Sequence, residues 1–235
     1  MNKTEIYFID DFHGVEQIYS WQKEQLDAIK PQLVFIEMLP CENKYVKICN
    51  DLSRGAISVD EFRLRTDWEN IWGTFKGYKE LFEYLQNKQI SIYPMDHSLK
   101  ERNSLVDLEL RIIRRLKSKA SIYDLVDESR IVLFMIREAV FSKNILNVVG
   151  REKVSKVAVI VGKNHIERLN NFFNFLDEYE SGFRIFPLTK RAKLYPKFRD
   201  LHLAYASRRK ILRMKYPPLV PINVLRFSLM SEFKK

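Results

Sequence analysis

One continuous apolar run constrains the fold of this 235-residue chain more than any other feature. Residues 157–161 read VAVIV, and four of the five are β-branched, which suits a strand buried on both faces of a parallel sheet. Gly162 ends the run, and residues 166–179 then show the apolar spacing of a helix. Side chains that follow such a strand lie at the carboxyl edge of the sheet, where open α/β sheets bind ligands. His165 is therefore a candidate functional residue; the alternative is that it packs at the start of a helix capped by Asn164.

Further strands and helices alternate along the chain. Strands are predicted over residues 5–9, 33–36, 89–93 and 183–187, in addition to 156–161. The connections are long enough for helical crossovers, which predicts an α/β fold: a mostly parallel β-sheet with helices on both faces. An aromatic stripe at helical spacing over residues 68–85 is assigned to the core or to a lid over a pocket.

Polar side chains follow the other strands as well. His13 follows the first strand, Glu37 the second, and Asp96 with His97 the third. Parallel strands bring these side chains and His165 to one rim. Simpler explanations exist, because Glu37 would also suit a salt bridge at the sheet edge and Asp96 a turn. Four strand ends that carry such groups on one edge nevertheless favour a functional site.

These segments resemble the TraB/PrgY/TIKI family, which belongs to a superfamily with ChaN-like and erythromycin-esterase-like proteins. The resemblance spans residues 4–188 and rests on three motifs: IYFIDDFHG, KPQLVFIEM and VAVIVGKNHIERL. Arg137 and Glu138 resemble the arginine/acid helix of the family. The sequence departs from the family pattern at Asp10, where the first Gly-x-x-His motif has its glycine, and no arginine follows closely after Glu37.

The resemblance implies a hydrolase for peptide or ester bonds, with a divalent metal (Zn, Mn or Co) at the carboxyl edge. His13, Glu37 and His165 would hold the ion, because imidazole and carboxylate groups suit these metals. The metal would activate a water molecule, or in a metal-free variant His13 would act as the base.

Other residues would complete this predicted site. Asp96 or Glu138 would orient a histidine or accept a proton, and Arg137 would stabilise a developing oxyanion. Contacts to the peptide or small-molecule substrate are assigned to Asp10, His97 and Asn164.

The alternative is a protein of the same fold that binds or sequesters a peptide, a metal or haem without catalysis. The superfamily suggests it, since ChaN-like members bind haem iron and TraB/PrgY members act on or sequester peptide pheromones. Haem is the less favoured of these ligands, because only His13 and His165 suggest an axial pair.

Positive charge is concentrated at the C-terminus. Residues 186–235 hold 13 Lys and Arg against two acids, whereas the whole chain holds 40 and 30. We therefore expect an α/β domain over residues 1–188 and a basic helical extension over 189–235. The extension either packs on the body with solvated charges, or binds nucleic acid or an anionic membrane surface through residues 189–215.

Composition narrows the class of protein further. Cys41 and Cys49 are the only cysteines and lack metal-binding spacing, which indicates reduced thiols. No apolar run reaches the length of about 20 residues that a spanning helix needs, and the N-terminus lacks a signal-peptide pattern. A cytoplasmic location is expected; the oligomeric state is not predicted.

Overall fold

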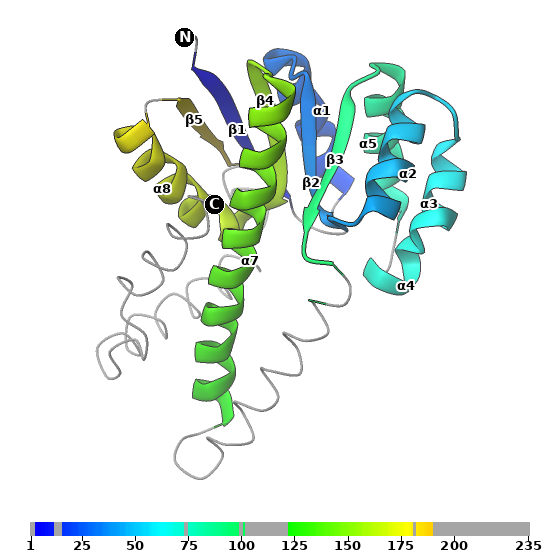
Figure 1. Ribbon diagram of the computed structural model, residues 1–235. Helices are drawn as coiled ribbons and strands as arrows, with labels where there is room; N and C mark the ends of the chain where they lie inside the picture. The colour runs from blue at the N-terminus through cyan, green and yellow to red at the C-terminus, as the bar shows by residue number, and fades with distance from the viewer. Residues whose placement is uncertain are drawn as a thin grey trace.

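The chain forms an open parallel sheet. The computed structural model describes residues 3–11, 16–72, 75–98, 101, 122–180 and 182–189. Five strands lie in the order β3-β2-β4-β1-β5, with every neighbouring pair parallel (Figure 1). The strands are β1 (Thr4–Asp11), β2 (Leu33–Pro40), β3 (Ser91–Asp96), β4 (Lys156–Gly162) and β5 (Phe183–Leu188). The predicted α/β fold with a mostly parallel sheet is confirmed.

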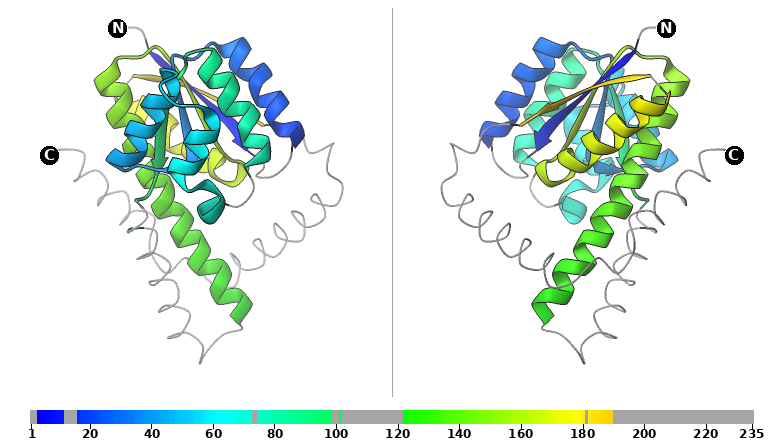
Figure 2. Two further views of the ribbon diagram at one scale, coloured as in Figure 1. Left: turned by 90° about the vertical axis from the view of Figure 1, so that its right-hand side faces the viewer. Right: turned by 90° about the vertical axis from the view of Figure 1, so that its left-hand side faces the viewer.

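Helices cover both faces of the sheet (Figure 2). One face packs against the first five helices and the other against the last two. They are α1 (Glu16–Ile29), α2 (Asn43–Ser53), α3 (Val59–Thr66), α4 (Trp68–Trp72), α5 (Lys76–Asn87), α7 (Ile122–Glu152) and α8 (Lys163–Glu180). The predicted helix over residues 99–117 lies outside the described residues apart from position 101.

Strand β4 contributes side chains to a hydrophobic core on each face of the sheet. Successive side chains of a strand point to opposite faces. Ala158 and Ile160 accordingly belong to the core beneath α1–α5, whereas Val157, Val159 and Val161 belong to the core beneath α7 and α8. All five are fully buried. The apolar run thus supplies both cores, as its lack of alternation predicts.

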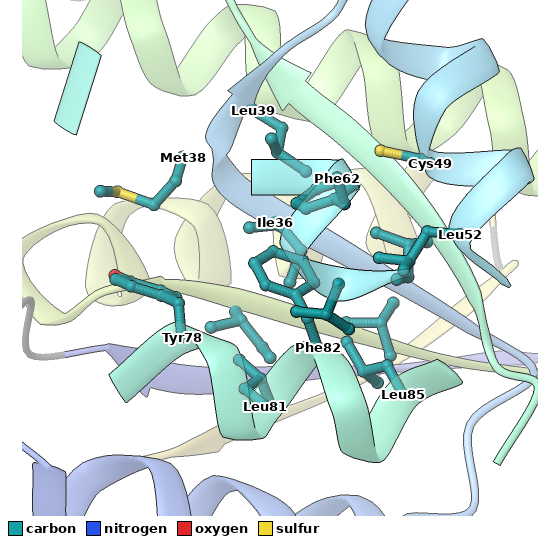
Figure 3. Packing of buried hydrophobic residues seen from close by; sticks show 14 of the residues in the cluster. Ile36, Met38, Leu39, Cys49, Leu52, Phe62, Tyr78, Leu81, Phe82 and Leu85 are labelled. Atoms are coloured by element: carbon teal, nitrogen blue, oxygen red, sulfur yellow. The ribbon is translucent and has the colours of Figure 1, made fainter. Parts of the chain in front are cut away.

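The aromatic stripe lies in the first of these cores. Its spacing does not form one helix, because α4 ends at Trp72 and α5 begins at Lys76. Trp68 of α4 packs against the residues at the start of α5. The centroid of its ring lies 5.2 Å from that of Phe75 and 4.8 Å from that of Tyr78. Figure 3 shows the α5 side chains, including Phe82, gathered with Ile36, Leu52 and Phe62. The assignment of the stripe to the core is confirmed for the side chains that the structure describes, which are Trp68, Phe75, Tyr78, Leu81, Phe82 and Leu85.

Three strands end at least two residues beyond their predicted limits. β3, predicted over residues 89–93, spans Ser91–Asp96, so Asp96 lies within the strand and not after it. The pairing of β1 with β4 continues through Asp10–Val161 and Asp11–Gly162, and β2 runs on to Pro40 with an irregular register after Ile36. Asp10 and Glu37 therefore lie inside strands and not in the turns after them. Backbone pairing with β4 holds β1 extended despite the two consecutive acids, which are poor strand formers.

Both edge strands of the sheet contain a proline. Pro94 lies in β3 and Pro187 in β5, and these strands end the strand order on either side. Proline lacks the N–H group that a further strand would require, so it is found mostly at sheet edges.

The C-terminal predictions remain open. Residues 190–235 lie outside the described residues, so the basic helical extension over 189–235 and its packing on the body stay predictions. The same holds for the suggested nucleic acid or membrane contacts of residues 189–215.

A pair of helical glycines tests the packing of α5. A Cβ atom at Gly77 would lie 1.9 Å from Cε2 of Tyr19, a buried ring packed against Tyr78, whereas one at Gly150 would meet nothing within 4 Å. Gly77→Ala is expected to lower the free energy of unfolding by about 1–3 kcal/mol through overpacking. Gly150→Ala should raise it by about 0.5–1 kcal/mol, because alanine favours the helix. Urea denaturation measures both; equal effects of the two substitutions would contradict the close approach of Gly77 to Tyr19.

Candidate functional site

The carboxyl edge of the sheet brings together charged side chains from five elements. Parallel pairing places the ends of β1, β2, β3 and β4 side by side, and α7 crosses the sheet beside them (Figure 1). The predicted residues found there are Asp10 on β1, Glu37 on β2, Asp96 on β3, Arg137 and Glu138 on α7, and His165 in the first turn of α8. The described residues of the sequence motifs therefore lie at the predicted edge, whereas His13 of the first motif lies outside the described residues.

Glu37 lies at the centre of this cluster. Its side chain is 4% exposed, yet both carboxylate oxygens have partners. The Gly162 N–H donates to Oε2 at 2.6 Å, while Oε1 lies 3.1 Å from Arg137 Nη2 and 3.4 Å from His165 Nε2. A buried carboxylate without such partners would be costly, so these contacts are what permit a charge inside the strand.

Gly162 explains the first position of the Gly-x-x-His motif. A Cβ atom there would lie 3.3 Å from Glu37 Oε2 and 3.8 Å from His165 Cδ2. The absent side chain lets the Glu37 carboxylate reach the backbone N–H at the end of β4. The glycine of the motif is therefore needed so that a side chain can come close to the backbone.

His165 is held between two carboxylates. Its Nδ1 lies 2.8 Å from Glu138 Oε1, and its Nε2 faces Glu37. The ring meets Phe141 edge-on, with centroids 5.3 Å apart. Burial by itself favours the neutral ring, but the hydrogen bonds to Glu138 and Glu37 outweigh it and raise the pKa of His165. The imidazolium form is therefore favoured.

Arg137 joins the third strand to the cluster. It donates from Nε and Nη2 to the two oxygens of Asp96, at 3.2 and 2.8 Å, and its guanidinium carbon lies 5.1 Å above the ring of Phe141. Asp96 also accepts the N–H of His97 at 2.8 Å. A bidentate arginine–carboxylate pair of this kind fixes geometry as well as charge.

Arg168 is a site residue that the sequence analysis missed. Its Nε donates to both oxygens of Glu138, at 2.7 and 2.6 Å. The available signal was spacing: residues three apart in a helix share a face, so Arg168 lies one turn beyond His165 on α8. Its partner, however, comes from another helix, and sequence does not reveal that pairing.

Asp10 and Asp11 point to opposite faces of β1. Asp11 accepts hydrogen bonds from Tyr78 Oη at 2.6 Å and from Gln22 Nε2 at 3.3 Å. Asp10 is fully buried, and among the described residues no side chain donates to its carboxylate, which only the backbone N–H groups of Asp11 and Lys163 approach. Burial raises the pKa of Asp10 to about 7, although the nearby Lys163 cation opposes the shift.

His97 differs from His165 in its partners. The side chain is 5% exposed, and its Nε2 has no hydrogen-bond partner in the described part of the chain. Nδ1 lies 3.9 Å from Glu101 Oε2, which is beyond hydrogen-bond length. Burial lowers the pKa of His97, and the nearby carboxylates of Asp96 and Glu101 oppose it only in part.

The predicted divalent-metal site is not supported. His13 lies outside the described residues, as does the side chain of Asn164. Glu37 and His165 are in contact, but the lone pairs that a metal would need are directed at Arg137, Gly162 and Glu138. Among the described residues, no group of three or more His, Cys, Asp and Glu is arranged to hold an ion. Glu37 and His165 instead belong to an ionic network, in which the atoms that could bind a metal take part in hydrogen bonds.

Comparison with known proteins places the chain in a family. Residues 1–130 match the family described as "Haem-binding uptake, Tiki superfamily, ChaN", and the chain belongs to it. No curated protein matches the sequence significantly. The predicted Tiki/ChaN superfamily is confirmed at this level, whereas membership of the TraB/PrgY branch is not supported.

The fold is similar to a solved structure of that family. The structure, which records cofacial haem binding to ChaN of Campylobacter jejuni, matches with a TM-score of 0.57 and 12% sequence identity. The match covers 81% of this chain and 83% of the other. No helix within the described ranges is long and apolar enough to cross a membrane.

Asp10 and Asp11, which are neighbours on β1, allow the energetic cost of burying the Asp10 charge to be tested. The raised pKa means that the folded chain holds the Asp10 proton more tightly than the unfolded chain, so stability falls as the pH rises from about 4 to 7. Asp10→Asn should therefore stabilise the protein by about 2–4 kcal/mol at pH 8 and by less at pH 5. Asp11→Asn, the matched control, should destabilise it at both pH values because Tyr78 and Gln22 lose a charged acceptor. Denaturant unfolding at the two pH values measures this; a gain for Asp10→Asn that does not depend on pH would contradict the assignment.

The charge state of His165 provides a second test. Because Glu138 raises the pKa of His165, Glu138→Gln should lower it. Titration of the imidazole C–H resonances by NMR measures the change. Glu167→Gln, which removes an exposed carboxylate from the same helix, should leave the His165 titration where it is. An unchanged curve for Glu138→Gln would show that the Glu138–His165 contact does not hold the proton.

Proposed function

We propose that this protein binds haem without catalysing a reaction on it, at or beside the carboxyl edge of the sheet. The observation that carries the proposal is the match of residues 1–130 to a haem-binding family, a range that includes β1, β2 and β3 with their edge residues. The similarity to the ChaN fold supports the same architecture. Haem, the less favoured ligand in the sequence analysis, becomes the favoured one.

The side chains at this edge fit the chemistry of haem. A haem site needs a donor to the iron and cations or N–H groups for the propionates. The described residues offer an imidazole nitrogen without a partner at His97, a half-buried thiol at Cys41, and the cation Lys163. The iron porphyrin would be bound cargo, so the chain would supply binding and orientation alone.

The electrostatics of the cluster favour binding over the predicted hydrolysis. A general base must take a proton from water, but the hydrogen bonds to Glu138 and Glu37 raise the pKa of His165 and so favour its protonated ring. Glu37 already faces three donors, from Gly162, Arg137 and His165. Both side chains therefore lack the poised basicity that hydrolysis would need.

Titration of the full-length protein with ferric haem tests the proposal. We expect a saturable shift of the haem absorption band with a dissociation constant of about 1 µM or tighter. Iron-free protoporphyrin is the matched control and should bind more weakly, because it has no iron to accept a protein donor. Parallel incubation with Zn, Mn and Co and an ester and peptide panel test the alternative. Absence of a haem complex together with metal-dependent hydrolysis would overturn the proposal in favour of the hydrolase.

A further inference from the structure

His97 is the one buried imidazole at the carboxyl edge whose Nε2 has no hydrogen-bond partner within the described residues. Buried polar atoms are nearly always paired, and a buried ring nitrogen without a partner destabilises the folded state. The contrast with His165 is direct, since both nitrogens of that ring face carboxylates. The packing of the fold alone does not explain why the Nε2 atom of His97 is buried without a partner.

The form of the ring suits a metal donor. Burial lowers the pKa of His97 and keeps the imidazole neutral at pH 7, which is the form that binds iron. Glu101 lies on the Nδ1 side, at 3.9 Å, so the proton is favoured there. The lone pair then lies on Nε2.

The backbone of His97 is held in place. Its N–H donates to Asp96 Oδ1 at 2.8 Å, and Asp96 is fixed in turn by Arg137. The Cys41 N–H donates to the carbonyl of Asp96 at 2.8 Å, which continues the β2–β3 pairing up to His97. A donor on such a rigid support keeps its position when a ligand binds.

Other iron-binding groups near the end of β3 are less suitable. Burial and the charge of Glu101 raise the pKa of the Cys41 thiol, so it stays protonated, whereas iron takes the thiolate. Met95 is fully buried in the core beneath α7 and α8. Of these three groups at the described end of β3, His97 is the most suitable donor.

We infer that His97 Nε2 is an axial ligand of the haem iron, an inference that rests on the proposed haem-binding function. Because the ring is buried, haem has to open the rim locally to reach it. The free energy of that opening reduces the apparent affinity for haem. Coordination of the unpaired Nε2 atom to iron offsets part of this loss.

Resonance Raman spectra of the ferrous complex test this on the full-length protein. The wild type should show an iron–imidazole stretching band, and His97→Gln should lose it. Haem affinity should also fall by at least about tenfold, because that much is lost even when only a group hydrogen-bonded to a metal ligand is removed. His97→Ala should regain an imidazole-bound spectrum when free imidazole is added. His202→Gln, a histidine from the C-terminal region, is the control and should keep the band. Circular dichroism confirms that each variant is folded.

The outcomes separate this inference from the proposed function. If the wild type binds haem but His97→Gln keeps the band, His97 is not the ligand, while haem binding stands. Loss of the band in His13→Gln instead would assign the iron to that residue and overturn the role of His97. If the wild type binds no haem at all, the proposed function fails together with the inference.

Discussion

The contact between the Glu37 carboxylate and the Gly162 amide is the interaction on which the carboxyl edge depends. It joins β2 to the end of β4, and through Arg137 and His165 the same carboxylate reaches α7 and α8. Both helices that cover the second core are thereby connected to the sheet at one buried charge. Removing that charge would leave several donors buried without an acceptor, which costs far more than the net value of any one of these hydrogen bonds.

Charge balance explains why this cluster is stable inside the protein. Its acids are Glu37, Asp96 and Glu138, and its cations are Arg137, Arg168 and a protonated His165. The cluster is neutral only when the imidazole is charged. The raised pKa of His165 is therefore a property of the whole network. A neutral, internally paired network holds side chains in fixed positions and is poorly suited to proton transfer, which agrees with a binding role.

The sequence was sufficient to predict the sheet, its two covered faces and the convergence of Glu37, Asp96 and His165, because strand periodicity and parallel topology determine them. The place of Arg137 and Glu138 beside them came from the family resemblance. The sequence was not sufficient to predict their pairing. His, Glu and Asp at strand ends match both a metal site and an ionic network, and the difference lies in Arg168 and the Gly162 amide, whose partners are distant in the chain. The limits of β1, β2 and β3 were wrong for a related reason, since pairing of β1 with β4 and of β2 with β3 overrides local propensity.

The prolines of the two edge strands bear on how copies of this chain can meet. An open sheet exposes unpaired backbone groups along both edges, and those groups can recruit a strand from another molecule and begin aggregation. Pro94 on β3 and Pro187 on β5 each remove one donor from an outer ladder. Growth of the sheet by strand addition is thus disfavoured on both sides. Within the part of the chain that the structure describes, the outer edges of the sheet are thus less open to a strand from another molecule, and its carboxyl edge is left undisturbed.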